Sequence, residues 1–148
     1  MRTDPIKILM VDDENVILEV AEEYFQKKGY EVFTAGNGIE ALDVLSREKI
    51  GCVFTDINMP VMDGLDLAEK IRMKDNTLPV VVMTGYPSLD NTIQTLKNGV
   101  IDYLIKPVNL EQMELTLKRI LRERELFVEN LILKEEVERQ ERLKKTEQ

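Results

Sequence analysis

The stretch Gly51-Cys-Val-Phe-Thr-Asp56 leads an apolar, β-prone run directly into a carboxylate, and the turn-rich segment Ile57-Asn-Met-Pro-Val-Met-Asp-Gly64 follows it. A nearly continuous apolar run of this length is typical of a strand buried on both faces, as in parallel sheets. Such a strand places Asp56 at its carboxyl end, where it either starts a turn or serves as a reactive group. The rest of the chain distinguishes these two interpretations.

Similar apolar runs alternate along the chain with segments of helical periodicity. The first helical segment repeats apolar residues at helical spacing, which predicts an amphipathic helix with these residues on its inner face. Strands that alternate with helices are typical of a parallel sheet with right-handed crossovers and helices on both faces. The expected inner-face residues are Ile17, Val20, Ala21, Tyr24 and Phe25. The expected strands are residues 7–11, 30–35, 50–55, 78–83 and 102–105, with a short helix at 89–97 before the last strand.

Composition restricts the class of protein. The 148 residues, of which 43% are hydrophobic, suit one domain with a sizeable core, and no apolar run is long enough to span a membrane. The single cysteine, Cys52, excludes an internal disulfide framework and favours a reducing compartment, so we expect a cytoplasmic protein. The net charge of −8, without a basic patch, argues against direct nucleic-acid binding.

The chain contains no histidine. This excludes Ser-His-Asp and Cys-His catalysis and any histidine metal site. It also excludes a phosphohistidine within these residues, so a phosphoryl group carried by histidine would come from another polypeptide or from a segment outside this sequence.

Polar residues follow four of the expected strands. Asp12-Asp13 come after the first strand, Asp56 after the third, Thr84 after the fourth and Lys106 after the fifth. The carboxyl ends of parallel strands meet at one edge of an open sheet, which is where ligands bind. Each residue alone could be a helix start, a turn, a loop hydroxyl or a surface charge, but all four at one edge favour a site.

The chemistry of this group favours phosphoryl transfer. Converging carboxylates repel one another, and one would take up a proton unless a cation lay between them. Mg²⁺ suits such a cluster, because two carboxylates and a backbone carbonyl are enough when waters complete its octahedron. Asp56 could then attack phosphorus, while Lys106 and the Thr84 hydroxyl would each contact a phosphoryl oxygen.

Four stretches together resemble the receiver domain of two-component response regulators, the CheY-like family. They are Val11-Asp-Asp-Glu14, Thr55-Asp-Ile-Asn-Met-Pro-Val-Met-Asp-Gly64, Met83-Thr-Gly-Tyr86 and Asp102-Tyr-Leu-Ile-Lys-Pro107. The resemblance covers residues 6–122 and implies a doubly wound, flavodoxin-like sheet with strand order 2-1-3-4-5. It also implies a phospho-acceptor that assists its own Mg²⁺-dependent phosphorylation and dephosphorylation, and not an enzyme. The implied phosphoryl donor is a histidine kinase or a phosphotransfer protein.

The resemblance assigns a role to each matching charged residue. Asp56 resembles the phospho-acceptor and a metal ligand. Asp13 resembles a direct Mg²⁺ ligand, and Asp12 resembles an acidic residue that acts largely through water. Lys106 resembles the phosphate-contacting lysine, and in this family its bond to Pro107 is cis.

The remaining roles concern the third metal ligand and the switch. The backbone carbonyl of Asn58 resembles the third protein ligand of Mg²⁺, and Asn58 and Tyr86 stand where the family tunes the lifetime of the acyl phosphate. Thr84 resembles the switch hydroxyl and Tyr103 the switch aromatic: phosphate draws Thr84 inward, and Tyr103 rotates into the vacated space. The alternative for Tyr103 is ordinary amphipathic packing.

Three other functions compete with a phospho-accepting receiver. A phosphatase of the haloacid dehalogenase type also uses an aspartyl nucleophile, but it needs a second Asp two residues later, where this chain has Asn58. A flavodoxin-like FMN carrier would suffer repulsion between the flavin phosphate and Asp12-Asp13. A receiver-like docking or dimerisation module that does not use phosphate remains the main alternative.

The chain is helical by pattern from residue 109 onward. An apolar stripe with 4-3-4-3-4 spacing approaches a heptad, and its first part is expected to pack on the sheet. We expect residues 123–148 to form a helical extension, either a coiled coil that mediates a homodimer, a connection to an output domain outside this chain, or a solvated monomeric helix. We expect the last residues, 142–148, to fray. The stripe consists of Met113, Leu117, Ile120, Arg124, Phe127 and Leu131.

Overall fold

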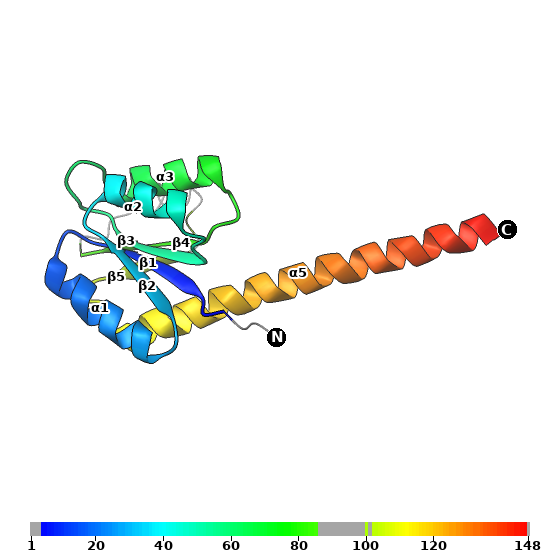
Figure 1. Cartoon of the computed structure of the whole chain (residues 1–148), viewed down its shortest axis with the longest axis horizontal. Helices are drawn as coiled ribbons and strands as arrows, with labels where there is room; N and C mark the ends of the chain where they lie inside the picture. The colour runs from blue at the N-terminus through cyan, green and yellow to red at the C-terminus, as the bar shows by residue number, and fades with distance from the viewer. Residues whose placement is uncertain (1–3, 86–99, 101, 148) are drawn as a thin grey trace. The chain divides into compact units, whose positions relative to one another are not determined.

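The computed structural model of the chain describes residues 4–85, 100 and 102–147, and it divides into two compact units, Met1–Gln112 and Met113–Gln148. The first unit holds one parallel sheet in the order β2-β1-β3-β4-β5 (Figure 1), which confirms the predicted fold class and strand order. The strands are β1 (Lys7–Val11), β2 (Glu31–Ala35), β3 (Cys52–Asp56), β4 (Val80–Thr84) and β5 (Asp102–Ile105). The described helices are α1 (Asn15–Lys27), α2 (Gly38–Arg47), α3 (Gly64–Lys74) and α5 (Leu110–Glu147).

The two faces of the sheet carry different helices (Figure 1). Leu9 and Val53 point into a buried cluster with residues of α2 and α3. Phe54 points to the opposite face, where its ring lies 6.3 Å from that of Phe25 of α1. Every residue of β3 and β4 is buried, as expected for inner strands of a sheet covered on both sides.

The predicted inner face of α1 was partly wrong. Leu18, Ala21 and Phe25 are the buried residues of this helix, whereas Ile17 and Val20 are 36% and 51% exposed. The helix carries apolar residues on more than one side, so the pattern alone allowed two rotations. The packing of Phe25 against the sheet selects the observed rotation.

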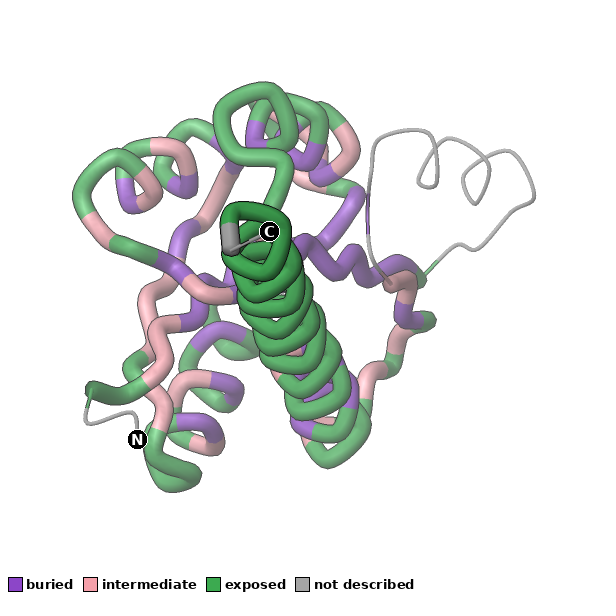
Figure 2. The backbone as a smooth tube through the Cα atoms, turned by 90° about the vertical axis from the view of Figure 1, so that its right-hand side faces the viewer, coloured by how far each residue is buried: buried purple, intermediate pink, exposed green. Residues whose placement is uncertain are grey.

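Helix α5 is 38 residues long and stays helical to Glu147, which contradicts the expected fraying. The Asn109 side chain accepts hydrogen bonds from the backbone N–H groups of Glu111 and Gln112 and so caps its first turn. Met113, Leu117 and Ile120 are buried, and residues 122–146 are exposed (Figure 2). Among the residues that the structure describes, no helix is both long and apolar enough to cross a membrane. The predicted helix at 89–97 lies outside the described residues.

The loop after β3 is closed by a contact that only glycine allows. The backbone N–H of Gly64 donates to the Ile57 carbonyl at 2.8 Å, and the Asp63 carboxylate caps α3 by accepting the Asp66 N–H at 2.8 Å. A Cβ atom at Gly64 would overlap the carbonyl oxygen of Asp56, which is main chain and cannot rotate away. The absence of a side chain at Gly64 therefore fixes how closely α3 approaches Asp56.

We expect Gly64→Ala to destabilise the protein by about 2 kcal/mol, because the new methyl group must displace backbone in a packed region. Urea unfolding of the variant measures this loss. Gly85→Ala is the matched control, since a Cβ there would meet nothing closer than the Lys106 Cβ at 4.0 Å. Equal free energies of unfolding for the two variants would show that the loop accommodates the methyl group without loss of stability.

Candidate functional site

In-register pairing brings the predicted polar residues to one edge of the sheet. Val11 pairs with Thr55. The residues that follow them in the sequence, Asp12 and Asp56, therefore lie at the same level of the sheet. In the same way Asp56 pairs with Met83, next to Thr84, and Thr84 pairs with Ile105, next to Lys106. The convergence expected at the carboxyl ends of the strands is confirmed.

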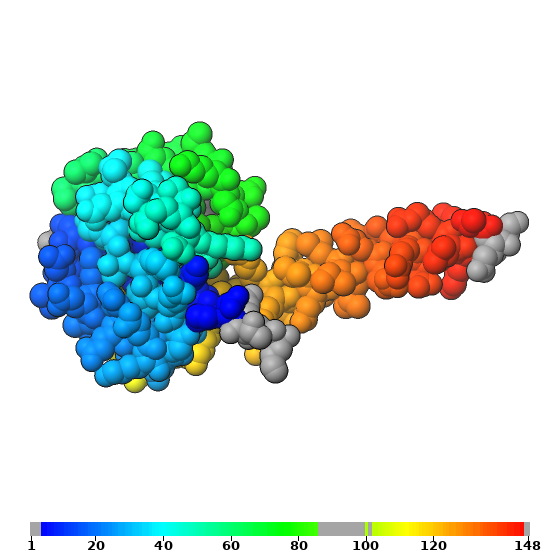
Figure 3. All heavy atoms as spheres, viewed as in Figure 1, coloured from blue at the N-terminus to red at the C-terminus, as the bar shows by residue number. Residues whose placement is uncertain are grey.

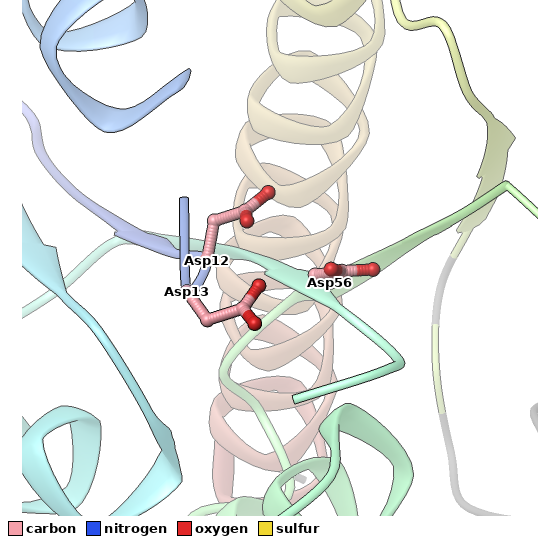
Figure 4. Close-up of side chains that lie close together, drawn as sticks. All are labelled: Asp12, Asp13 and Asp56. Carbon is pink, nitrogen blue, oxygen red and sulfur yellow. The ribbon is translucent and has the colours of Figure 1, made fainter. Parts of the chain in front are cut away.

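Asp12, Asp13 and Asp56 form an acidic cluster in which one carboxylate oxygen of each lies within 4.8 Å of the others (Figure 4). Asp12 is 1% exposed and Asp56 6% exposed, whereas Asp13 is exposed. The donors of the cluster are carboxylate oxygens only, which hard divalent cations prefer. The cluster could therefore bind a metal ion.

Lys106 links the two buried carboxylates. Its Nζ lies 3.0 Å from Oδ2 of Asp12 and 3.3 Å from Oδ2 of Asp56. Its backbone N–H donates to the Thr84 carbonyl at 2.7 Å, which ties the lysine to the end of β4. The peptide bond from Lys106 to Pro107 is cis, as the sequence resemblance implied.

The electrostatics of the site follow from burial and proximity. Burial raises the pKa of Asp56 above its ordinary value, and the charge of Asp12 adds to this, while Lys106 and a hydrogen bond from the Asn58 backbone oppose it. Burial alone would lower the pKa of Lys106. Its hydrogen bonds to Asp12 and Asp56 and their charges outweigh burial, so the pKa of Lys106 is raised.

The other predicted residues occupy different depths of the same region. Thr84 is fully buried at the end of β4, and Asn58 is exposed in the loop after Asp56. Tyr103 is half-buried in β5 and packs against the cluster beneath α2 and α3. Its hydroxyl is buried and has no hydrogen-bond partner among the described residues. Tyr86 lies outside the described residues, and the Asn58 carbonyl as a metal ligand stays a prediction.

Sequence reasoning missed two contacts in the site. It assigned Lys106 to phosphate alone, whereas the lysine also pairs with Asp12, whose Oδ1 accepts the backbone N–H of Glu14 at 3.0 Å. It also gave Gly64 no role beyond its place in the loop. The Asp63-Gly64 pair at a helix start was the available signal, because glycine is the residue that permits close backbone approach.

Comparisons with known proteins agree with this geometry. A family model for the response regulator receiver domain matches residues 8–118. Sporulation initiation phosphotransferase F of Bacillus subtilis is 33% identical over 115 residues, which cover 78% of this chain and 93% of that protein. The transcriptional regulatory protein ZraR of Klebsiella oxytoca is 35% identical over 121 residues, which cover 82% of this chain and only 27% of that protein.

Solved structures show the same fold. A CheY-like receiver domain protein from Methanospirillum hungatei superimposes with a TM-score of 0.80 at 33% identity, over 82% of this chain and 98% of that one. The response regulator TrrA of Thermotoga maritima, solved in complex with Mg²⁺ and BeF, gives a TM-score of 0.71 at 32% identity, over 78% and 98% of the two chains.

We expect Asp56→Asn to stabilise the protein without divalent cations at about pH 7, with a gain that shrinks as the pH falls toward the ordinary pKa of an aspartate. Between the ordinary and the raised pKa of Asp56, the folded state binds more protons than the unfolded state, so stability falls as pH rises through this window. Urea unfolding in a chelator measures the effect, with the exposed Asp43→Asn as control. Destabilisation by Asp56→Asn at neutral pH would contradict it.

Proposed function

Since the chain belongs to the response regulator receiver domain family, we propose that Asp56 accepts a phosphoryl group from a partner histidine kinase or phosphotransfer protein and thereby switches a protein-interaction surface. The observation that carries this proposal is the buried pair Asp12 and Asp56, joined by Lys106 at the carboxyl edge of the sheet. We place the receiver domain at residues 6–122, with a helical extension at 123–148, and expect it to work in the cytoplasm.

The acidic cluster fits a divalent cation, and we assign Mg²⁺ to it. Asp12, Asp13 and Asp56, together with the backbone carbonyl of Asn58, would hold the ion. Bound there, Mg²⁺ supplies positive charge that offsets the negative charge of the phosphoryl group. The solved complex of TrrA with Mg²⁺ and BeF supports this assignment.

The residues of the site would share the work of phosphoryl transfer. A carboxylate oxygen of Asp56 forms the new bond to phosphorus while the nitrogen–phosphorus bond of the donor breaks. Lys106, already 3.3 Å from Asp56, balances charge on one phosphoryl oxygen, and the Thr84 hydroxyl donates to another. The protein acts as an acceptor that assists its own phosphorylation and dephosphorylation, and it has no separate substrate.

Thr84 and Tyr103 would transmit the effect of phosphorylation at Asp56 to the protein surface. Thr84 pairs in register with the strand that holds Tyr103. The Tyr103 side chain packs against the buried cluster, and no described residue forms a hydrogen bond with its hydroxyl. A shift of Thr84 toward phosphate alters the space beside this ring, and the ring position alters the surface around β5.

The exposed stripe on α1 gives the phosphoryl donor a place to bind. Val16 and Val20 are 71% and 51% exposed, and they lie on α1 just after Asp13. Exposed apolar residues on the helix that follows Asp13 suit a partner that must bring its own reactive group to this edge of the sheet.

The central test is labelling by the small phosphodonor acetyl phosphate with Mg²⁺. We expect stoichiometric, Mg²⁺-dependent labelling of the native protein and none of Asp56→Asn, because the proposal assigns the phosphoryl group to the Asp56 carboxylate. Asp43→Asn, an exposed aspartate that pairs with Arg47, should label normally. Intact-mass spectrometry after removal of the unreacted acetyl phosphate measures the product.

Two outcomes would favour other functions. Persistent labelling of Asp56→Asn would refute the acceptor assignment. A native protein that takes no label under any Mg²⁺ concentration would support the alternative function, a docking or dimerisation module that does not use phosphate.

The exposed part of α5 supports a second proposal, which is a homodimer formed through this helix. Its exposed apolar residues continue beyond the buried turn at Ile120. Long helices with apolar residues on their surface gain stability by pairing. The chain spans only about a quarter of ZraR and half of PrrA from Mycobacterium bovis, so we also propose that the switch acts on an output domain or separate target. The exposed apolar residues are Leu126, Phe127, Val128, Leu131, Ile132, Leu133, Val137 and Leu143.

We expect sedimentation equilibrium to show dimers that Leu131→Glu weakens about tenfold or more, because a charge at an apolar helix contact is desolvated on pairing. Gln140→Glu adds the same charge to an exposed polar position of this helix and should leave the equilibrium unchanged. A monomer at high concentration, with and without phosphate, would count against pairing through α5.

A further inference from the structure

Thr55 lies directly before Asp56 in β3 and is fully buried. Val53 and Ile57, two positions before and after it, belong to the buried cluster beneath α2 and α3, and alternation along the strand places Thr55 on the same face. In Figure 3 these helices lie side by side on the visible face, α2 in cyan and α3 in green. The Thr55 hydroxyl is thus a polar group in an apolar layer, which costs stability unless it forms a hydrogen bond.

The Thr55 hydroxyl finds its partner in the main chain of the next residue. Its Oγ1 donates to the carbonyl oxygen of Asp56 at 3.0 Å. The sulfur of Met59 lies 4.0 Å from the same Oγ1, but a thioether is a weak acceptor and the hydroxyl has one proton, so the carbonyl receives it. The pairing of β1 with β3 ends at Val11 and Thr55. The Asp56 carbonyl therefore accepts a side-chain hydrogen bond just beyond the point where this pairing stops.

The peptide group between Asp56 and Ile57 is held at both ends. Its carbonyl accepts the threonine hydroxyl, and its N–H donates to the Met83 carbonyl of β4 at 3.0 Å. Gly64 of α3 approaches the same carbonyl oxygen so closely that a Cβ atom there would overlap it. The orientation of this one peptide determines both the direction of the Asp56 side chain and the start of the loop that follows.

We propose that Thr55 is a positioning residue for the phosphorylation of Asp56, because its hydroxyl fixes the peptide that joins Asp56 to the loop. This role rests on the proposed function of Asp56. A rotation of the peptide would change the distance of 3.3 Å between Oδ2 of Asp56 and Nζ of Lys106. It would also move the Asn58 carbonyl, which we assign to Mg²⁺. Thr55 itself would contact neither the metal nor the phosphoryl group.

Packing alone does not require a hydroxyl at this position. Valine has nearly the same shape as threonine and is equally suited to a buried strand, and Val80–Val82 fill the neighbouring strand β4. Two pairs of proteins therefore isolate the hydroxyl. Native protein and Thr55→Val differ in little else. Thr55→Ser and Thr55→Ala both lack the methyl group, so the loss of packing is shared and the hydroxyl remains the main difference.

The first measurement is the rate constant for labelling by acetyl phosphate at saturating Mg²⁺. We expect it to fall about tenfold from native protein to Thr55→Val, and about tenfold from Thr55→Ser to Thr55→Ala, because loss of the hydroxyl releases the peptide beside the acceptor. Thr55→Ser should stay within about threefold of the native rate. Thr34→Val makes the same change in β2, away from the site, and should label at the native rate.

Two further measurements do not need phosphoryl transfer. Calorimetry should show that the Kd for Mg²⁺ rises about threefold or more when the hydroxyl is lost, since the loop that leads to Asn58 is less restrained. Hydrogen exchange should show that the Ile57 amide exchanges about tenfold faster, relative to the Phe33 amide of β2, because local opening at this peptide costs less. Circular dichroism verifies that each variant is folded.

The possible outcomes separate a positioning role from a purely structural one. Lower free energies of unfolding in urea, with unchanged labelling rates and Mg²⁺ affinities, would mean that Thr55 only stabilises β3 and would overturn the proposal. Equal labelling rates for Thr55→Ser and Thr55→Ala would overturn it as well. Absence of labelling in the native protein would count against the proposed function of Asp56. The Mg²⁺ affinities and the Ile57 exchange rates would then decide the role of Thr55, and unchanged values would reject it.

Discussion

Lys106 holds two buried carboxylates at the edge of the sheet, and the arrangement of the site depends on this one cation. Burying Asp12 and Asp56 together is unfavourable, because each loses water and each repels the other. One ammonium group within 3.3 Å of both offsets part of that cost. A metal ion or a phosphoryl group that entered the site would change the charge balance of these pairs, so the proposed chemistry would act on contacts that already hold the folded site together.

The parallel sheet explains why residues far apart in the sequence meet at the site. It also determines which features of the site can be predicted from the sequence. Buried parallel strands appear in the sequence as apolar runs, and the residues that follow these runs lie at the carboxyl edge of the sheet. The positions of Asp56, Thr84 and Lys106 were therefore predicted correctly from the sequence. The pairing of Lys106 with Asp12 was not predictable, because β3 and β4 lie between their two strands and side-chain reach over that distance has no sequence signature. The prediction of the inner face of α1 was partly wrong for a related reason. Ile17 and Leu18 are both strongly apolar, and only packing against the sheet determines which of them is buried.

The two edges of the sheet have different chemistry. The carboxyl edge gathers Asp12, Asp13 and Asp56 near Lys106. The amino edge has a cavity with aliphatic lining, and its rim carries charges of both signs. Helices α2 and α3 run between the edges and pack on the same buried cluster.

The buried hydroxyl of Tyr103 has no hydrogen-bond partner within the described part of the chain. A polar group buried without a partner costs about 1–3 kcal/mol, which corresponds to a factor of about 5–150 between two conformers. If the Tyr103 ring changes position as the proposed switch requires, the hydrogen bonds open to its hydroxyl in each position would help to set the ratio of the two conformers. Substitutions near this ring would then shift that ratio without touching Asp56.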